Sequence, residues 1–167
     1  MGVRNYLVEG HSGTGKTSVC SELQRRGHHA VHGDRVLAYV GDPQTGEPSD
    51  VPAHEHHIWD MESVRVLVAD TTDAVTFSCG GARNSSAFLH LSDGVFVVEV
   101  DLGTLTRRLD ARPDDEWAAA KPVEHERIVR WHQTKQGAPQ HGTPIDATAP
   151  LAHVVDDILR HVEAMTC

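Results

Sequence analysis

Short apolar runs alternate with longer amphipathic stretches along most of the chain. The runs with the length of buried strands, bounded by turn-forming residues, are 6–8, 29–31, 75–79, 95–98 and 143–146. Apolar residues recur at helical spacing in the stretches 16–26, 34–40, 55–69, 84–91, 102–109, 123–135 and 151–162. Strands that alternate with helices predict an α/β domain built on a parallel sheet.

Length and composition change this picture little. A chain of 167 residues has the size of one domain, and it can bury a hydrophobic core without disulfides. Cys20, Cys79 and Cys167 show neither CxxC pairing nor metal-type spacing. We therefore expect two small core residues and one terminal thiol, which fits a reducing cytosol.

Charge narrows the possible partners. The formal net charge is −9, and an acidic surface repels polyphosphate, so nucleic acid is not an expected partner.

The chain enters the apolar run at Tyr6 without a charged leader or a long apolar segment. Neither a signal peptide nor a membrane helix is expected, and the protein is predicted to be cytoplasmic.

One contiguous motif carries specific chemistry. Residues 10–17 match the phosphate-loop (P-loop) pattern G-x-x-x-x-G-K-[S/T] at every fixed position, after an apolar run and before an amphipathic helix. Glycines let several backbone amides point at one phosphate, and the positive end of the following helix adds to them. The expected nucleotide-binding residues are Gly10, His11, Ser12, Gly13, Thr14, Gly15, Lys16, Thr17 and Ser18.

Within this loop, Lys16 is expected on the β- and γ-phosphates, and Thr17 is expected to offer its hydroxyl to Mg²⁺. The nucleotide is ATP or GTP. A GTPase would need an Asn/Thr-Lys-x-Asp motif and an ABC-type ATPase a Leu-Ser-Gly-Gly motif, and neither occurs. AAA-type machines need further domains, for which the chain is too short.

With these classes excluded, the chain resembles the P-loop nucleoside and nucleotide kinase group, which includes adenylate, shikimate and gluconate kinases. The resemblance rests on the P-loop and on the strand and helix of 95–112. It implies a three-layer α/β/α P-loop fold over 1–167, with a five-stranded parallel sheet in the order 2-3-1-4-5. It also implies an acceptor-binding insertion near 41–60 and a small lid near 112–122.

The resemblance also implies roles for particular residues. Arg108 and Arg112 match the lid arginines that clamp the transferring phosphate, and planar guanidinium groups suit its spread charge. Asp34 follows the second strand, where these kinases place an acid facing the P-loop. It is expected to orient the acceptor or hold Mg²⁺, or to cap the following helix. Arg83 is expected to pair with an anionic acceptor, whereas Asn84 is expected to cap a helix.

Two features depart from the pattern. The third strand ends in Cys79-Gly80-Gly81 instead of the Asp-Gly segment of adenylate kinases, which disfavours a standard nucleoside monophosphate as acceptor. Asp70 and Asp101 are in poor contexts for a second metal-binding acid, which leaves Asp34. His54, His56, His57 and Trp59 are candidates for the acceptor pocket, with His57 the chosen one, although solvent-facing histidines are the simpler interpretation.

The sequence thus predicts an ATP- and Mg²⁺-dependent small-molecule kinase, with a catalytic set of Lys16, Asp34, Arg108 and Arg112. The acceptor is a nucleoside-like or other small hydroxyl compound, which the sequence does not identify. The alternative is a nucleotide-binding regulatory module with weak or no ATPase activity. A monomer or a homodimer is expected.

Overall fold

The computed structural model describes residues 4–51, 53–116, 121–136 and 142–167. One parallel sheet runs through its centre in the strand order β2-β5-β1-β6-β7. The strands are β1 (Arg4–Glu9), β2 (His29–His32), β5 (Val75–Cys79), β6 (Gly94–Glu99) and β7 (Thr143–Asp146). Counted by themselves along the chain, these five strands have the expected order 2-3-1-4-5. The P-loop strand β1 therefore lies in the middle, between β5 and β6.

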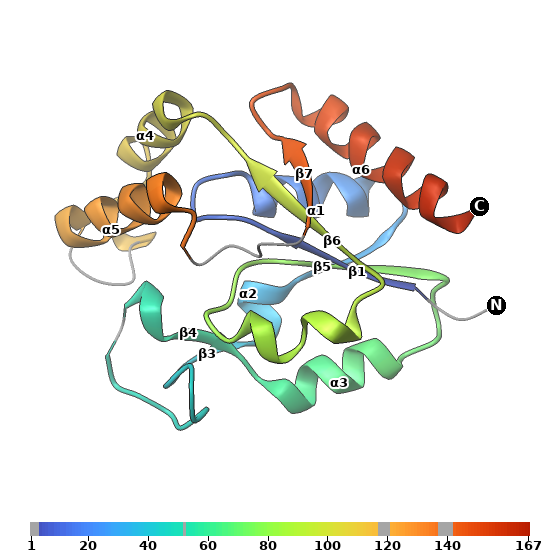
Figure 1. The fold of residues 1–167 in the computed structure, drawn as a ribbon, viewed down its shortest axis with the longest axis horizontal. Helices are drawn as coiled ribbons and strands as arrows, with labels where there is room; N and C mark the ends of the chain where they lie inside the picture. The colour runs from blue at the N-terminus through green and yellow to red at the C-terminus, as the bar shows by residue number, and fades with distance from the viewer. Residues whose placement is uncertain (1–3, 52, 117–120, 137–141) are drawn as a thin grey trace.

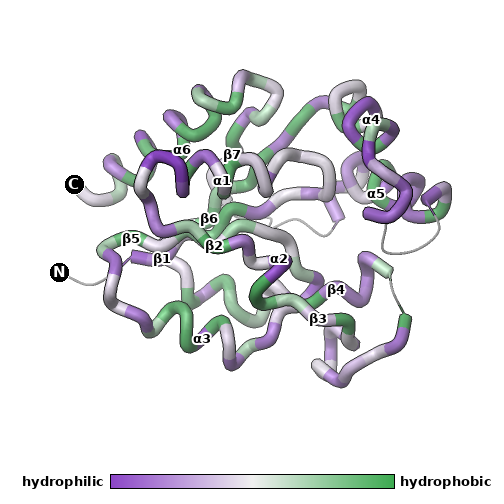
Figure 2. The backbone as a smooth tube through the Cα atoms, turned by 180° about the vertical axis from the view of Figure 1, so that it is seen from behind, coloured by the Kyte–Doolittle hydropathy of each residue, from purple (hydrophilic) through white to green (hydrophobic). Residues whose placement is uncertain are grey.

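Helices cover both faces of this sheet (Figure 1). The helices α1 (Lys16–Arg25) and α6 (Leu151–Thr166) lie on one face, and α3 (Met61–Ala69) lies on the other. The helices α4 (Leu102–Asp110) and α5 (Lys121–Thr134) pack beside each other and share the core of the first face. Figure 2 shows hydrophobic stretches along the central strands and alternating character along α6, as expected for strands buried on both faces and a half-buried helix.

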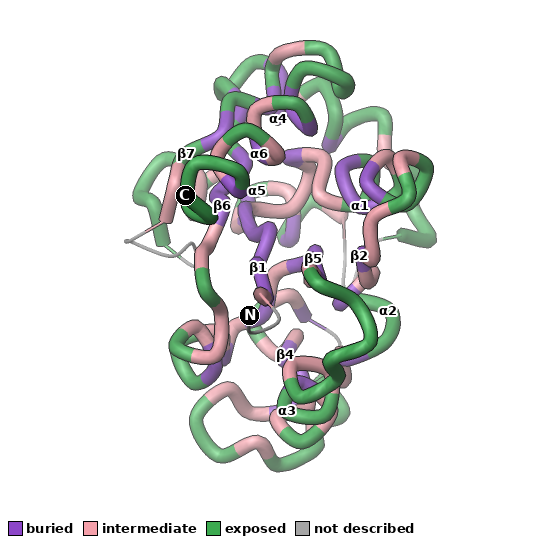
Figure 3. The backbone as a smooth tube through the Cα atoms, turned by 90° about the vertical axis from the view of Figure 1, so that its right-hand side faces the viewer, coloured by how far each residue is buried: buried purple, intermediate pink, exposed green. Residues whose placement is uncertain are grey.

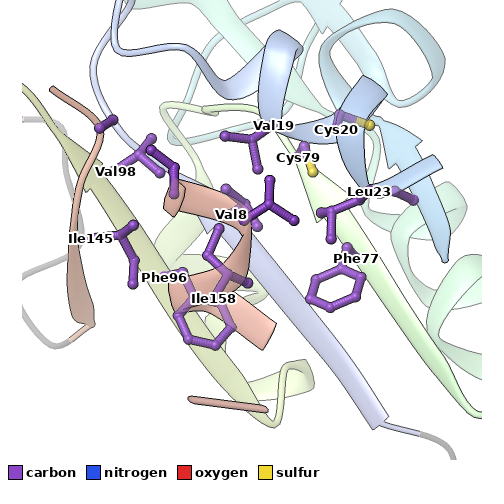
Figure 4. Packing of buried hydrophobic residues seen from close by; sticks show 14 of the residues in the cluster. Val8, Val19, Cys20, Leu23, Phe77, Cys79, Phe96, Val98, Ile145 and Ile158 are labelled. Carbon is purple, nitrogen blue, oxygen red and sulfur yellow. The ribbon is translucent and has the colours of Figure 1, made fainter. Parts of the chain in front are cut away.

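The larger core fills the space between the sheet and the helices α1 and α6. Val8, Phe77 and Phe96 of neighbouring strands point toward Leu23 of α1 and Ile158 of α6 (Figure 4). Cys20 and Cys79 are buried in this core and Cys167 is exposed, as expected, and all three thiols are free. β1 is buried along almost its whole length (Figure 3), so the P-loop begins from a rigid central strand.

A small antiparallel hairpin stands apart from the main sheet. It pairs β3 (Ala38–Val40) with β4 (His57–Trp59) and follows the short helix α2 (Gly33–Val36). The expected helices over 34–40 and 55–69 are therefore wrong in part, since only Gly33–Val36 and Met61–Ala69 are helical. Ile58 and Trp59 are fully buried in the hairpin, and the side chain of Asp60 accepts a hydrogen bond from Ser63 N and starts α3. Tertiary pairing thus overrides the helical period of this segment.

The second core lies under this hairpin, on the α3 face of the sheet. Trp59 stacks on Phe88 with ring centroids 5.2 Å apart, beside Leu7 and Leu37. The expected helix over 84–91 is replaced by two 3₁₀ turns, Ser85–Ala87 and Leu89–Leu91. Within the described residues, no helix is both long and apolar enough to cross a membrane.

Candidate active site

The P-loop connects β1 to α1 and is shaped by its glycines. Gly13 and Gly15 have φ angles of 87° and 101°, in the left-handed region that side-chain-bearing residues avoid. Thr14 ties the loop together, because its hydroxyl donates to the carbonyl of His11 at 2.7 Å. α1 begins directly afterwards at Lys16, so its unpaired amides face the loop.

Lys16 is held against the loop that it is expected to serve. Its ammonium donates to the carbonyls of Gly10 (2.6 Å) and His11 (2.9 Å). Burial lowers the pKa of Lys16, while the nearby carboxyl groups of Asp34 and Glu9 act in the opposite direction. The amine of Lys16 is therefore already positioned beside the loop before a phosphate arrives.

A pocket of about 290 Å³ opens over the P-loop. Two further groups suit a metal there, since the hydroxyl of Thr17 and the carboxylate of Asp34 both line the pocket. Hard oxygen ligands of this kind suit Mg²⁺, which takes few protein ligands and completes its shell with phosphates and water. Among the described residues, no group of three or more His, Cys, Asp or Glu could hold a metal by itself.

An adjoining pocket of about 260 Å³ lies between α1 and the turn after β7. Arg108 of α4 joins the two sides, because its guanidinium donates to the carbonyls of Gly13 (3.4 Å), Thr14 (3.1 Å) and Ala147 (3.2 Å). Its side chain lines both this pocket and the phosphate pocket. Arg108 thus connects the P-loop to the turn after β7.

The carboxylate of Asp34 is fixed by several donors at the carboxyl end of the sheet. Its Oδ1 accepts hydrogen bonds from His57 Nε2 (2.9 Å), Trp59 Nε1 (3.0 Å) and Gly81 N (3.1 Å). Burial raises the pKa of Asp34, but the bond from His57 and the charge of Lys16 outweigh it and hold the pKa below its ordinary value. Asp34 lies inside α2 and caps nothing, so the expected capping role is wrong.

The glycines after β5 make room for this carboxylate. A Cβ at Gly80 would lie 2.6 Å from both Asp34 Oδ1 and Trp59 Cζ2, and one at Gly81 would lie 3.3 Å from the carbonyl of Gly10. Any side chain at Gly80 would push Asp34 away from the P-loop. The absence of the Asp-Gly segment of adenylate kinases thus has a structural reason in this chain.

A larger cleft of about 430 Å³ adjoins the phosphate pocket. His57, Arg83 and Arg112 all line it, and Arg83 lies over the ring of Trp131, 4.4 Å from its centroid. This cation–π contact covers one face of the guanidinium. The N–H donors at the edge of the guanidinium remain in position to bind an acceptor. Burial lowers the pKa of Arg112, which still leaves it charged at neutral pH.

Other expectations for this region are wrong. Asn84 does not cap a helix: its amide accepts from Trp59 N (3.0 Å) and donates to Trp59 O (2.9 Å), which clamps β4. Trp59 is fully buried and does not line the cleft; its Nε1 donates a hydrogen bond to Oδ1 of Asp34. By contrast, His54 and His57 both line the cleft, and His54 is the first residue of the 3₁₀ turn His54–His56. Of the expected lid, residues 117–120 lie outside the described residues.

Sequence reasoning missed Glu9, the last residue of β1. It is 1% exposed, and neither of its carboxylate oxygens has a hydrogen-bond partner among the described residues. Burial raises its pKa to about 8, with Lys16 and Arg83 opposing and Asp34 adding to the rise. An acid directly before the first P-loop glycine, at the end of a buried strand, was the available signal.

Two solved kinase structures share this arrangement. A gluconokinase from Sinorhizobium meliloti 1021 superposes with a TM-score of 0.57 at 16% identity, covering 97% of this chain and 93% of that one. A shikimate kinase from Bacteroides thetaiotaomicron superposes with a TM-score of 0.58 at 12% identity, covering 96% and 98%. This chain has a P-loop kinase fold. At such low identity, the similarity concerns the fold alone.

Curated relatives match only part of the chain. The HPr kinase/phosphorylase of Streptococcus salivarius is 36% identical over 83 residues, which are 48% of this chain and 24% of that protein. The protein of the same name from Streptococcus pyogenes serotype M1 is 45% identical over 50 residues, which are 29% and 16%. The chain thus spans about a quarter or less of the length of these relatives. No protein-family model matches the chain.

Proposed function

We propose that this P-loop kinase fold transfers the γ-phosphoryl group of ATP, with Mg²⁺, to a small acceptor. One observation supports this most strongly: Lys16, Asp34 and Arg112 line both the phosphate pocket and the larger cleft. A bound phosphoryl group and a molecule in the cleft would therefore share the same charged residues. Phosphoryl transfer depends on such positioning and electrostatic stabilisation.

On the donor side, the amides of residues 10–18 and the ammonium of Lys16 would hold the phosphates. Thr17 and Asp34 would hold Mg²⁺, whose charge supports phosphate departure. Arg108 would fix the turn at Ala147 against the base, and Arg112 would face the charge that develops on the transferring group. GTP fits the same loop, and ATP is the donor that the kinase resemblance favours.

On the acceptor side, the hydroxyl group of the acceptor would donate a hydrogen bond to the carboxylate of Asp34, which would orient the acceptor. The low pKa of Asp34 makes it a weak base, so orientation is its main contribution. The acceptor oxygen bonds to phosphorus, the bond to the β-phosphate oxygen breaks, and the acceptor proton leaves to solvent. Arg83 and His57 would contact the rest of the acceptor, and the guanidinium of Arg83 favours an anionic group there.

The test is ADP release from ATP and Mg²⁺ in the presence of adenosine, AMP, D-gluconate or shikimate, with Lys16→Ala as the inactive control. Strong stimulation by one compound in the unmodified protein, and none in the variant, is the expected result. ATP binding without stimulation by any of them would instead support a nucleotide-binding regulatory module. Omitting Mg²⁺ in the same assay tests the metal requirement.

A further inference from the structure

The wall of the larger cleft contains a histidine that the proposed function does not use. His54 belongs to the 3₁₀ turn His54–His56 and lines the cleft with Arg83 and Arg112. Its Nδ1 lies 2.6 Å from Oε2 of Glu124 in α5. Glu124 is only 1% exposed, so this contact is shielded from solvent.

The surroundings of Glu124 determine which ring nitrogen of His54 carries the proton. Arg127 donates to Oε1 of Glu124 at 2.6 Å, and the backbone amide of His54 approaches Oε2 at 3.4 Å. Both carboxylate oxygens therefore act as acceptors, and Nδ1 of His54 must donate. In the neutral ring, Nε2 then holds the lone pair. Among the described residues, no hydrogen-bond partner contacts Nε2.

The charge state of the ring fits the same arrangement. Burial lowers the pKa of His54 below its ordinary value of 6.5, and the charges of Arg112 and His57 add to this, while Glu124 opposes it. Glu124 acts on the ring from α5, Arg112 from the segment after α4 and His57 from β4, while Arg127 of α5 pairs with Glu124, and Arg83 and Glu116 line the same cleft. At neutral pH the ring is neutral, and Nε2 accepts hydrogen bonds.

We propose that His54 determines acceptor specificity: its Nε2, oriented by Glu124, accepts a hydrogen bond from a hydroxyl or N–H group of the acceptor. The inference rests on the proposed function, because it concerns the same cleft. It adds a requirement that the anion-binding arginines do not impose, namely a donor group on the acceptor. A buried dyad of this kind orients the ring as in other carboxylate–histidine pairs.

The competing explanation is mechanical, since the contact also joins the hairpin region to α5. Two His54 variants separate the explanations. The side-chain amide of His54→Asn places a donor where Nδ1 was, so it keeps the contact with Glu124 but removes Nε2. His54→Ala removes both. If Nε2 binds the acceptor, His54→Asn should raise KM for the stimulating compound of the four-compound panel about tenfold, with KM for ATP and the melting temperature unchanged.

Glu124→Gln provides the complementary test. Its Oε1 remains the acceptor for Arg127, so its NH₂ group faces Nδ1 and forces the proton of His54 onto Nε2. Nε2 then donates a hydrogen bond instead of accepting one, while the protein stays folded. KM for the same compound should therefore rise about tenfold as well. In the unmodified protein, this KM should also rise as the pH falls through the lowered pKa of His54 and the ring gains a proton on Nε2. A wild-type KM in both His54→Asn and Glu124→Gln would overturn the proposal and leave only the mechanical role.

Nitrogen NMR of the His54 ring, assigned by comparison with His54→Asn, makes the test independent of the acceptor. The expected result at pH 7 is a proton on Nδ1 in the unmodified protein and on Nε2 in Glu124→Gln. A proton on Nε2 of the unmodified protein would overturn the inference even if the kinase assay succeeds. If no panel compound stimulates ADP release, the proposed function fails, and the ring tautomer alone decides whether Nε2 is an acceptor.

Discussion

The proposed donor and acceptor sides of the site are built in different ways. The donor side consists largely of backbone groups. They are the continuous loop of residues 10–18 and the carbonyls that accept hydrogen bonds from Arg108. The acceptor side is largely side chains from separate elements, namely Asp34 of α2, His57 of β4, Arg83 after β5 and His54 of the 3₁₀ turn. The hydrogen bond from His57 to Asp34 and the contacts of His54 with Glu124 and of Arg83 with Trp131, instead of a contiguous loop, define its shape.

This difference has a general meaning for P-loop folds. A backbone site can bind the same triphosphate in many proteins, because amides and carbonyls are present whatever the sequence. A side-chain site changes with each substitution, so acceptor specificity can vary on a constant scaffold. The following variants test this division of labour.

The largest effect is expected for Lys16→Ala on the donor side. Loss of the ammonium beside Gly10 and His11 should lower nucleotide turnover about a thousandfold. The fold should persist, because the change removes a partly buried charge. Steady-state ADP release measures the effect, and Arg65→Ala, which removes an exposed charge on α3, is the control. Equal turnover in Lys16→Ala and the unmodified protein would refute the phosphate-loop assignment.

Glu9 lies where the two sides meet, and its replacement should change stability. Its pKa is about 8 in the folded protein and 4.5 ordinarily, so unfolding releases a proton between these values. The free energy of unfolding should therefore fall as the pH rises from 4.5 to 8. Glu9→Gln mimics the neutral acid and should be more stable than the unmodified protein by about 4 kcal/mol at pH 8 and nearly equally stable near pH 4.5.

Urea unfolding at several pH values measures this difference. Parallel stability curves for the two proteins would show that Glu9 is ionised in the fold, contrary to the expectation.

On the acceptor side, Asp34→Asn should lower kcat about a hundredfold with little change in KM for ATP. Oδ1 can still accept from His57 and Trp59, and the new amide can occupy the Oδ2 position, whose one contact is the long bond from Gly81 N (3.4 Å). Asp70→Asn, at the exposed end of α3, is the matched control. A normal kcat in Asp34→Asn would limit this residue to a structural role.

A pair of glycine variants measures how tightly the acceptor side is packed. Gly80→Ala should destabilise the fold by about 2 kcal/mol, because its Cβ meets Asp34 and Trp59. Gly27→Ala has a positive φ of 86° but nothing within 4 Å, so it should cost only about 1 kcal/mol of backbone strain. Thermal unfolding compares the two, and equal losses would mean that the packing at Gly80 adds nothing.

The smallest effect is expected at the far end of the donor side. Arg108→Ala removes the links among Gly13, Thr14 and Ala147 and should raise KM for ATP about tenfold, with kcat less affected. Arg107→Ala is the neighbouring control, since within the described part of the chain its guanidinium donates a hydrogen bond only to the hydroxyl of Thr104. A kcat effect larger than the KM effect would instead place Arg108 at the transferring phosphate.

The P-loop and the central strands were easier to locate from the sequence, for a physical reason. A P-loop is contiguous, so its spacing is visible in the letters, and strands buried on both faces appear as apolar runs such as 95–98. The order of the five parallel strands followed from the resemblance to P-loop kinases.

The acceptor side was harder to predict because its contacts join distant residues. β4 has only three residues within a segment of helical period, and its pairing with β3 depends on the burial of Ile58 and Trp59. The clamp between Asn84 and Trp59 and the dyad of His54 and Glu124 have no spacing signal, since their partners are far apart in the chain. Asp34 was identified from its place after a strand, but its three donors were not.

The bonds of Arg108 also have a consequence for biosynthesis. Gly13 emerges early from a ribosome, whereas α4 and the turn at Ala147 emerge much later, and β6 is still missing beside β1 when the P-loop sequence is complete. A nascent chain therefore carries the whole motif without the groups that brace it. Any stabilisation by nucleotide that depends on the bonds of Arg108 is available only after the turn at Ala147 has docked, so the growing chain folds up to that point without it.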